Sequence, residues 1–319
     1  MNAQQTMVTL VEEYLALRRG MGYELYIEGA ELLRFARYAD GNGRHGHGPI
    51  TTELAVEWAK LPQQADPLYW ARRLDIVRRF AKHRRLFDPQ TEVPPEGLLG
   101  LSYRRPQPHI YSDDAIRQLI HQASLLGPAG GLRPKTYQTL FGLLACTGLR
   151  ISEALRLRRN DVDVQQGLMT IFATKFTKTR LVPLHPSAAQ ALQRYSQQRD
   201  QYHLHPRSET FFLTEHGTSL KYWRVLMTFI TLRQQLGWET KGRPFPTIHG
   251  LRHSFAVSCL VQWYREGADV DRRIAALSTY LGHVKVTDTY WYLTATPELL
   301  SLSTERFERF AGQSRGGDL

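Results

Sequence analysis

The residues from 247 to 256 include side chains that could act on an anion, because His249, Arg252 and His253 all lie within this stretch. A proline-rich segment, 242–246, precedes it, and the apolar residues near its end predict a helix that enters a core. Histidine and arginine at a helix start favour anion binding, since free backbone N–H groups and the helix dipole point the same way. A basic helix start that faces only solvent explains the same spacing.

Two further basic residues, Arg150 and Lys175, are candidates for binding an anion. Arg150 is expected at a junction between two helices, flanked by apolar residues, and Glu153 can reach back to hold it. Lys175 lies on the turn between two predicted strands, 167–172 and 180–184. A lysine on a turn is usually solvated, but the tip of a hairpin moves easily into a substrate groove, so Lys175 is a candidate.

The composition is that of an ordinary soluble chain with a basic balance. The 319 residues carry a formal net charge of +11, which favours a polyanionic partner, nucleic acid first and an anionic membrane second. No run of roughly 18 apolar residues exists to span a membrane, and the first residues lack the pattern of a secretory signal. Cys146 and Cys259 are predicted to be buried thiols, which indicates the reducing cytoplasm.

A strongly basic helix is predicted from Pro67 to Arg85, with seven Lys/Arg against one acid, Asp75. Unpaired arginines on a rigid helix suit DNA phosphates, and a solvated face is the alternative. The candidate DNA contacts are Arg72, Arg73, Arg78, Arg79, Lys82, Arg84 and Arg85.

The fold class predicted is mainly α with a small antiparallel β-sheet, in two domains. Five prolines between 88 and 109 indicate a linker, and we place the domain boundary near Pro106. The domains are then 1–105, which is helical, and 106–319. His45 and His47 lie in a glycine-rich loop with no further ligand at metal spacing, so no metal site is predicted.

Four short segments follow one another along the chain in a particular order. They are Thr-Gly-Leu-Arg-Ile-Ser-Glu-Ala-Leu at 147–155, then His249 and Arg252, then Leu-Gly-His at 281–283, and then a tyrosine nine residues later. The ordered set resembles the tyrosine recombinases, the phage integrase family, over residues 110–310. The resemblance implies a catalytic domain at 106–319 and, more loosely, a helical core-binding (SAM-like) DNA-binding domain at 1–105, arranged as a C-shaped clamp.

The resemblance also implies a role for each matching residue. The catalytic set is Arg150, Lys175, His249, Arg252, His283 and Tyr292, with Glu153 as the supporting acid. Tyr290 lies two residues before Tyr292 and is the alternative nucleophile, but the family spacing from Leu-Gly-His selects Tyr292. The chain departs from the family at Phe176, where glycine is common, and at 291–293, where a smaller run ending in histidine is usual.

The implied chemistry is phosphodiester cleavage without a cofactor. Two arginines clamp the non-bridging oxygens with permanently protonated forks, and the two histidines donate hydrogen bonds or relay protons. Tyr292 joins the 3′-phosphate, and Lys175 protonates the departing 5′-oxygen. The covalent bond conserves the phosphodiester energy, so neither ATP nor a metal is required.

The partner implied is double-stranded DNA, bound by a homo-tetramer that acts alone or with related recombinases, and not a membrane. The predicted last helix, 297–310, is expected to complete the core or to dock on a neighbouring subunit. The main hypothesis is a site-specific recombinase or integrase of a mobile element, which exchanges strands between two duplexes. Resealing to the same or a folded strand defines the alternative, a type IB topoisomerase-like or hairpin-resolving enzyme. A DNA-binding protein with a decayed site is a third reading, disfavoured by the complete residue set.

Overall fold

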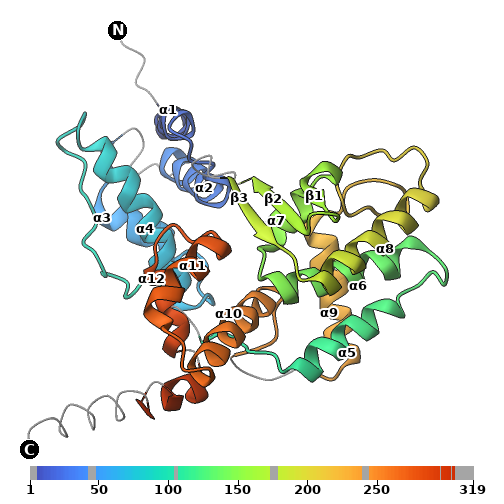
Figure 1. The fold of residues 1–319 in the computed structure, drawn as a ribbon. Coiled ribbons are helices and arrows are strands. Elements are labelled where there is room, and N and C mark those ends of the chain that lie inside the picture. Colours follow the sequence, from blue (N-terminus) through green and yellow to red (C-terminus); the bar gives the residue numbers. More distant parts are fainter. Residues whose placement is uncertain are drawn as a thin grey trace, which may run out of the picture. The chain divides into compact units, whose positions relative to one another are not determined.

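The computed structural model describes residues 6–41, 48–103, 107–172, 179–238, 244–294, 296–302 and 304–305. The chain divides into two compact units, an N-terminal unit (Met1–Arg105) and a C-terminal unit (Pro106–Leu319). Figure 1 shows that helices make up most of both units and that the strands belong to the C-terminal unit.

The N-terminal unit packs its helices around aromatic side chains. Its helices are α1 (Met7–Gly20), α2 (Tyr26–Gly41), α3 (Thr52–Lys60) and α4 (Pro67–Arg84). Side-chain oxygens of Thr6, Thr51 and Asp66 cap the starts of α1, α3 and α4. Phe35, Trp58 and Phe80 lie in the core, each at most 1% exposed. Helix α1 ends at Gly20 and α2 begins at Tyr26.

The C-terminal unit begins with a helical layer and a small sheet. In chain order its elements are α5 (Asp113–Ser124), α6 (Leu132–Thr147), α7 (Ile151–Arg156), η1 (Arg159–Asp161), β1 (Val162–Asp163), β2 (Leu168–Phe172), β3 (Thr179–Pro183), α8 (Pro186–Tyr202), α9 (Tyr222–Gln235), α10 (Ile248–Arg265), α11 (Val270–Leu281), α12 (Thr287–Tyr290) and η2 (Trp291–Thr294). Residues 297–302 are helical too, which is the described start of the predicted last helix. Helix α6 packs against α5, α8 and α10 and forms the centre of the unit (Figure 1).

The sheet is antiparallel in the order β1-β2-β3. Met169 pairs with Val182 and Ile171 pairs with Arg180. Because side chains alternate between the two faces of a strand, these four residues point to one face. Met169, Ile171 and Val182 are buried there, so the register also turns Arg180 toward the interior of the unit. Both predicted strands are confirmed, and β1 was not predicted.

The prediction of buried cysteines is wrong for Cys146, which is exposed, whereas Cys259 is half-buried. On α6 the buried positions are taken by Leu143, Leu144 and Thr147, and this leaves Cys146 on the outer side of the last turn. Among the described residues, no helix is long and apolar enough to cross a membrane.

Candidate active site

The beginning of α7 holds a carboxylate against an arginine, as the sequence suggested. Arg150 is the N-cap residue, and its backbone N–H donates to Glu153 Oε2 over 2.9 Å. Its side chain donates to Glu153 Oε1 over 3.0 Å and to the Gly282 carbonyl over 2.9 Å. The guanidinium, 38% exposed, is therefore fixed at the edge of the site while it remains open to a ligand.

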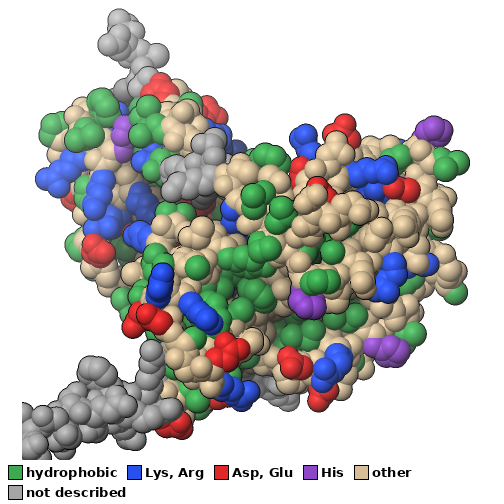
Figure 2. Space-filling model, in the orientation of Figure 1, with side chains coloured by type: hydrophobic (Ala, Val, Ile, Leu, Met, Phe, Trp, Pro, Cys, Tyr) green, Lys and Arg blue, Asp and Glu red, His purple; other side chains and the backbone are tan. Residues whose placement is uncertain are grey.

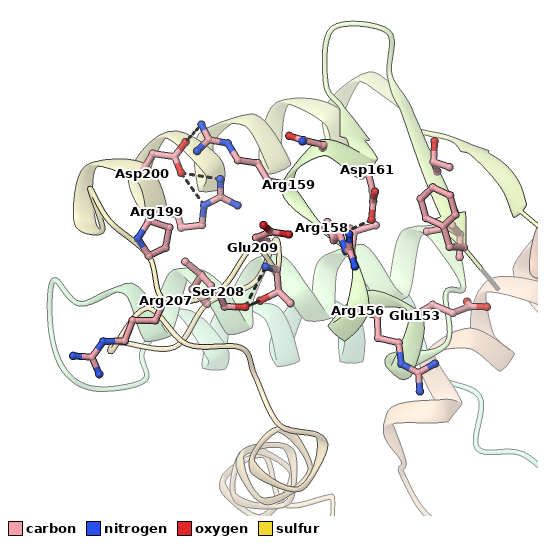
Figure 3. A pocket seen from close by; sticks show the side chains of 18 residues that line it. Glu153, Arg156, Arg158, Arg159, Asp161, Arg199, Asp200, Arg207, Ser208 and Glu209 are labelled. Carbon is pink, nitrogen blue, oxygen red and sulfur yellow. Dashed lines mark hydrogen bonds and ion pairs between the residues drawn. The ribbon is translucent and has the colours of Figure 1, made fainter. Parts of the chain in front are cut away.

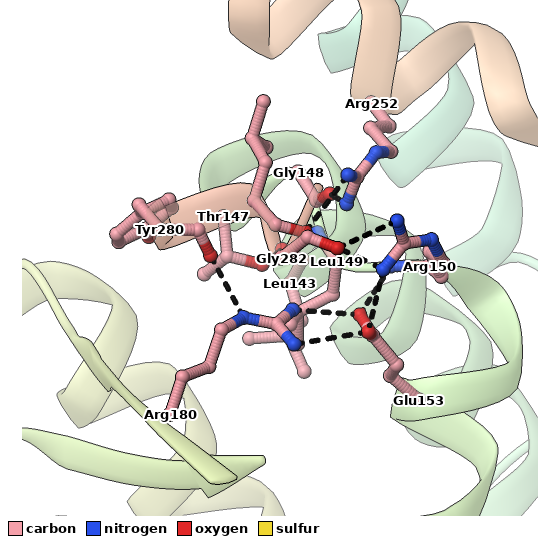
Figure 4. A network of polar contacts seen from close by, with 11 residues as sticks. Leu143, Thr147, Gly148, Leu149, Arg150, Glu153, Arg180, Arg252, Tyr280 and Gly282 are labelled. Atoms are coloured by element: carbon pink, nitrogen blue, oxygen red, sulfur yellow. Dashed lines mark hydrogen bonds and ion pairs between the residues drawn. The ribbon is translucent and has the colours of Figure 1, made fainter. Parts of the chain in front are cut away.

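A second arginine, Arg180, reaches the same carboxylate from β3. It donates to the two carboxylate oxygens of Glu153 over 3.0 and 2.9 Å and to the Tyr280 carbonyl over 2.8 Å. In Figure 4, Arg150 and Arg180 point toward Glu153 from two sides. The sequence analysis gave Arg180 no role, although strand alternation with Val182 was a usable signal. Gly282 has a φ of +70°, and a Cβ there would lie 2.7 Å from Arg180 Nη1, so a larger residue would displace Arg180.

Arg252 of α10 is the most buried of the three arginines, at 2% exposed. It donates to the Gly148 carbonyl over 2.7 Å and to the Leu281 carbonyl over 2.8 Å, and Figure 4 shows it beside Gly148. Burial, and then repulsion from Arg150, lowers the pKa of Arg252 to about 10. The group is still protonated at neutral pH, yet its partners here are neutral carbonyls.

The described cluster has a net positive charge, because it contains three guanidinium groups, those of Arg150, Arg180 and Arg252, and one carboxylate, that of Glu153. Burial by itself would raise the pKa of Glu153, but hydrogen bonds and charge from Arg180, and then from Arg150, hold that pKa below its ordinary value. Glu153 is therefore ionised at neutral pH. Three guanidinium groups against one carboxylate leave room for an added anion.

The phenol of Tyr292 lies between two histidines. Tyr292 is 2% exposed, its Oη is 3.2 Å from His253 Nδ1, and its ring stacks on His283 with centroids 6.1 Å apart. Thr289, fully buried, is 2.6 Å from His283 Nδ1 and orients that ring.

The Leu-Gly-His segment, 281–283, connects the arginines to the phenol. The carbonyls of Leu281 and Gly282 accept hydrogen bonds from Arg252 and Arg150, and the next side chain, His283, packs on Tyr292. The structure thus brings together four of the six predicted catalytic residues with their supporting acid. Tyr290, in contrast, is 42% exposed on α12, and this geometry favours Tyr292 as the nucleophile.

The other two predicted catalytic residues are His249 and Lys175. His249 is exposed, and its ring contacts His253 with centroids 4.4 Å apart. His253 in turn contacts the Tyr292 phenol. Lys175 lies outside the described residues. His253 lies in the stretch from 247 to 256, but no catalytic role was predicted for it.

The arginines of α4 in the N-terminal unit are mostly occupied. The assignment of Arg73 as a DNA contact is wrong, because the residue is 7% exposed, stacks over Trp58 at 3.9 Å and donates to the Trp58 carbonyl. Arg78 pairs with Glu96 over 2.9 Å, and Arg79 pairs with Asp75 over 2.6 Å.

The remaining cations of this segment form a surface set, which is Arg72, Lys82, Arg84 and Arg85. In the described part of the chain, none of these four forms an ion pair. Figure 2 shows Lys and Arg side chains gathered over this part of the N-terminal unit.

A second hollow, which Glu153 also lines, lies between η1, the edge of the sheet and the end of α8 (Figure 3). Within it, Asp200 binds Arg159 over 2.6 Å and Arg199 over 2.7 Å. It does not include Tyr292 or either histidine of the phenol site. The described residues contain no group of three or more His, Cys, Asp or Glu placed to hold a metal ion.

Comparison with known proteins agrees with this geometry. Residues 112–298 match the phage integrase family. The chain is 41% identical over 305 residues to y4rB of Sinorhizobium fredii (strain NBRC 101917 / NGR234), whose name assigns it to the integrases/recombinases, and the match covers 94% of this chain and 96% of the relative. A second chain of that strain, y4rE, is 34% identical, with 93% and 94% covered.

Solved structures show the same fold. The Tn1549 transposon integrase in complex with transposon right end DNA superposes with a TM-score of 0.67 at 17% identity, covering 96% of this chain and all of that one. The XerH site-specific recombinase bound to a palindromic difH substrate gives 0.66 at 15% identity, covering 94% and 85%. The chain belongs to the phage integrase family. It is a tyrosine site-specific recombinase, an enzyme of DNA recombination.

Proposed function

We propose that this recombinase cleaves and rejoins double-stranded DNA through a 3′-phosphotyrosyl bond on Tyr292. The observation that carries the proposal is a buried phenol set beside a cluster of arginines with excess positive charge. A phenol is a weak nucleophile at neutral pH, with an ordinary pKa of about 10. Nearby positive charge stabilises the phenolate and also attracts the phosphate that it attacks.

Arg150 and Arg252 take the non-bridging oxygens of the scissile phosphate. A guanidinium carries five N–H donors, and the hydrogen bonds of Arg252 to the Gly148 and Leu281 carbonyls engage one donor on each terminal nitrogen. Further donors therefore remain for a phosphate. Because the carbonyl and carboxylate contacts fix both guanidinium groups in advance, little reorganisation accompanies the reaction. Glu153 and Arg180 keep Arg150 in place.

The other assignments follow the family resemblance. Lys175 is the general acid that protonates the 5′-oxygen as it leaves, and His249 and His283 assist the phosphate as donors or proton relays. The N-terminal unit contributes DNA-backbone contacts through the surface set of Arg72, Lys82, Arg84 and Arg85. The active assembly is a tetramer on two duplexes, the enzyme acts in the cytoplasm on its DNA, and the DNA belongs to a mobile element.

The experiment that tests this proposal uses nicked duplexes tiled across the DNA that flanks the gene. Cleavage a few nucleotides from the nick releases a short 5′-hydroxyl fragment, so the covalent complex accumulates. The adduct is digested, and the DNA-linked peptide is mapped by mass spectrometry. We expect the DNA on Tyr292, no adduct from Tyr292→Phe, and an undiminished adduct from Tyr290→Phe. DNA linked to Tyr290, or an adduct that persists in Tyr292→Phe, would overturn the proposal.

A second labelled duplex in the same reaction measures strand exchange. Label that moves to the second duplex supports recombination, whereas label that is only resealed into its own duplex supports the topoisomerase-like activity.

A further inference from the structure

The hydroxyl of Tyr292 has a specific partner that the family resemblance does not supply. His253 Nδ1 lies 3.2 Å from Tyr292 Oη, within reach of a hydrogen bond, and the two ring centroids are 5.5 Å apart. His253 follows Arg252 directly on α10 and is half-buried. Its ring is confined by Trp291, with centroids 5.5 Å apart, and by His249 at 4.4 Å. The imidazole is therefore held in one orientation against the phenol.

The other two histidines are less suited to act on the phenol proton. His283 stacks on the face of the Tyr292 ring, and its Nδ1 is 2.6 Å from Thr289 Oγ1. His249 is exposed and meets His253 edge to face. His253, in contrast, has a ring nitrogen, Nδ1, at hydrogen-bond distance from the phenol oxygen.

We propose that His253 orients Tyr292 and accepts its proton as the phenol attacks the scissile phosphate. This inference rests on the proposed function. In the forward step, the bond from Tyr292 Oη to phosphorus forms, the bond from phosphorus to the 5′-oxygen breaks, and the phenol proton moves to His253 Nδ1. The 5′-oxygen takes its proton from the general acid. In rejoining, the 5′-hydroxyl attacks phosphorus and gives its proton back to the general acid. The bond from Tyr292 Oη to phosphorus breaks, and His253 returns its proton to the departing Tyr292 oxygen, so atoms and charges balance.

The charged and titratable groups that face His253 are consistent with this role. They are His249 on its own helix, Tyr292 from η2, and His283 across the phenol ring. A bound phosphate adds negative charge beside the phenol, and this favours the positive charge that His253 gains during the attack.

The test compares adduct formation by the full-length wild-type chain, His253→Ala and His253→Asn on a nicked duplex that traps the wild type. Asparagine places an acceptor oxygen near the Nδ1 position, so it preserves orientation but takes up no proton. The exposed His121 of α5 provides the matched control, His121→Ala. Thermal melting and duplex binding are measured for each variant, and single-turnover rates are followed from pH 5.5 to pH 9.

We expect His253→Ala to slow adduct formation by about 100-fold at pH 7, with wild-type melting and binding. Its rate should rise about tenfold per pH unit, because hydroxide must then remove the phenol proton, while the wild-type rate levels off. Added imidazole should restore the rate of His253→Ala. His253→Asn should bind DNA normally and share the steep pH dependence, and His121→Ala should match the wild type.

Two results would overturn the inference. One is a wild-type rate in His253→Ala. The other is the same loss at every pH without rescue by imidazole, which describes a purely structural residue. A wild-type chain that forms no adduct, or forms it elsewhere than on Tyr292, would instead overturn the proposed function beneath it.

Discussion

Two groups of arginines in this chain look alike in sequence and differ in structure. On α4, Arg78 and Arg79 each have a carboxylate partner, and Arg73 is stacked on Trp58 in the core of the N-terminal unit. In the C-terminal unit, Arg150 and Arg252 bind backbone carbonyls from distant segments. Three arginines in a run of basic residues are thus held by partners within the N-terminal unit.

The second group remains positive because Arg252 binds carbonyl dipoles and Arg150 shares its one carboxylate, Glu153, with Arg180. Carbonyls orient a guanidinium without cancelling its charge, and burial makes the remaining positive potential stronger. The comparison teaches that the partners of an arginine, more than the number of arginines, indicate where a phosphate binds.

The largest effect that would sharpen this comparison is expected at Arg252. Arg252→Lys keeps the positive charge but loses the planar fork that binds Gly148, Leu281 and the phosphate. We expect adduct formation on a nicked duplex to fall by about 1,000-fold. The matched control is Arg79→Lys on α4, which should keep the wild-type rate. Equal rates for the two variants would mean that charge alone suffices at Arg252.

A second prediction compares two carboxylates that each hold an arginine. Glu153 is 11% exposed between Arg150 and Arg180, whereas Glu96 is 85% exposed beside Arg78. Glu153→Gln leaves two guanidinium groups without their counter-charge, so we expect a loss of about 3 kcal/mol in the free energy of unfolding. Glu96→Gln should lose less than about 1 kcal/mol. Denaturant unfolding at pH 7 measures both, and equal losses would contradict the comparison.

The same pair gives a pH dependence. The folded state holds the pKa of Glu153 below its ordinary value of 4.5, so the stabilising contribution is present above that pH. It is lost as the pH falls through the folded-state pKa. The difference in unfolding free energy between the wild type and Glu153→Gln should therefore shrink in unfolding series taken at progressively lower pH below 4.5. A constant difference would show that Glu153 does not titrate with folding.

The smallest effect concerns the surface set of α4. Lys82 and Arg85 are exposed. Replacing both by alanine should make the slope of log binding constant against log salt concentration less negative by about 2. Arg79→Ala should change the slope less, because Asp75 already neutralises that arginine. Duplex binding between 50 and 200 mM salt, about the usual range for such series, measures the slopes. An unchanged slope for the double variant would remove α4 from the DNA interface.

The sequence predicts local geometry well where neighbours in the chain determine it. The capping of Arg150 by Glu153 and the two strands that form the hairpin follow from short-range patterns, and the structure confirms them. The start of helix α6 at Leu132 was not predicted. Its Gly131 N-cap forms no side-chain hydrogen bond, so no capping signal marks that start.

Long-range packing set the limits of the sequence analysis. Arg73 is buried because Trp58 of α3 and Glu31 of α2 lie against it, and no pattern within α4 announces those partners. Contact between His253 and Tyr292 joins residues 39 positions apart. Arg180 was accessible to reasoning, since alternation from the buried Val182 points it inward, but its partner Glu153 becomes evident only in the folded chain.

The central claim is that the scissile phosphate sits between Tyr292 and the two carbonyl-held arginines. The most direct measurement is a crystal structure of the chain covalently trapped on a nicked duplex. We predict phosphorus bonded to Tyr292 Oη, with its non-bridging oxygens at hydrogen-bond distance, about 3 Å, from the guanidinium groups of Arg150 and Arg252. A phosphate bonded to Tyr290, or one that lies away from both arginines, would contradict the account.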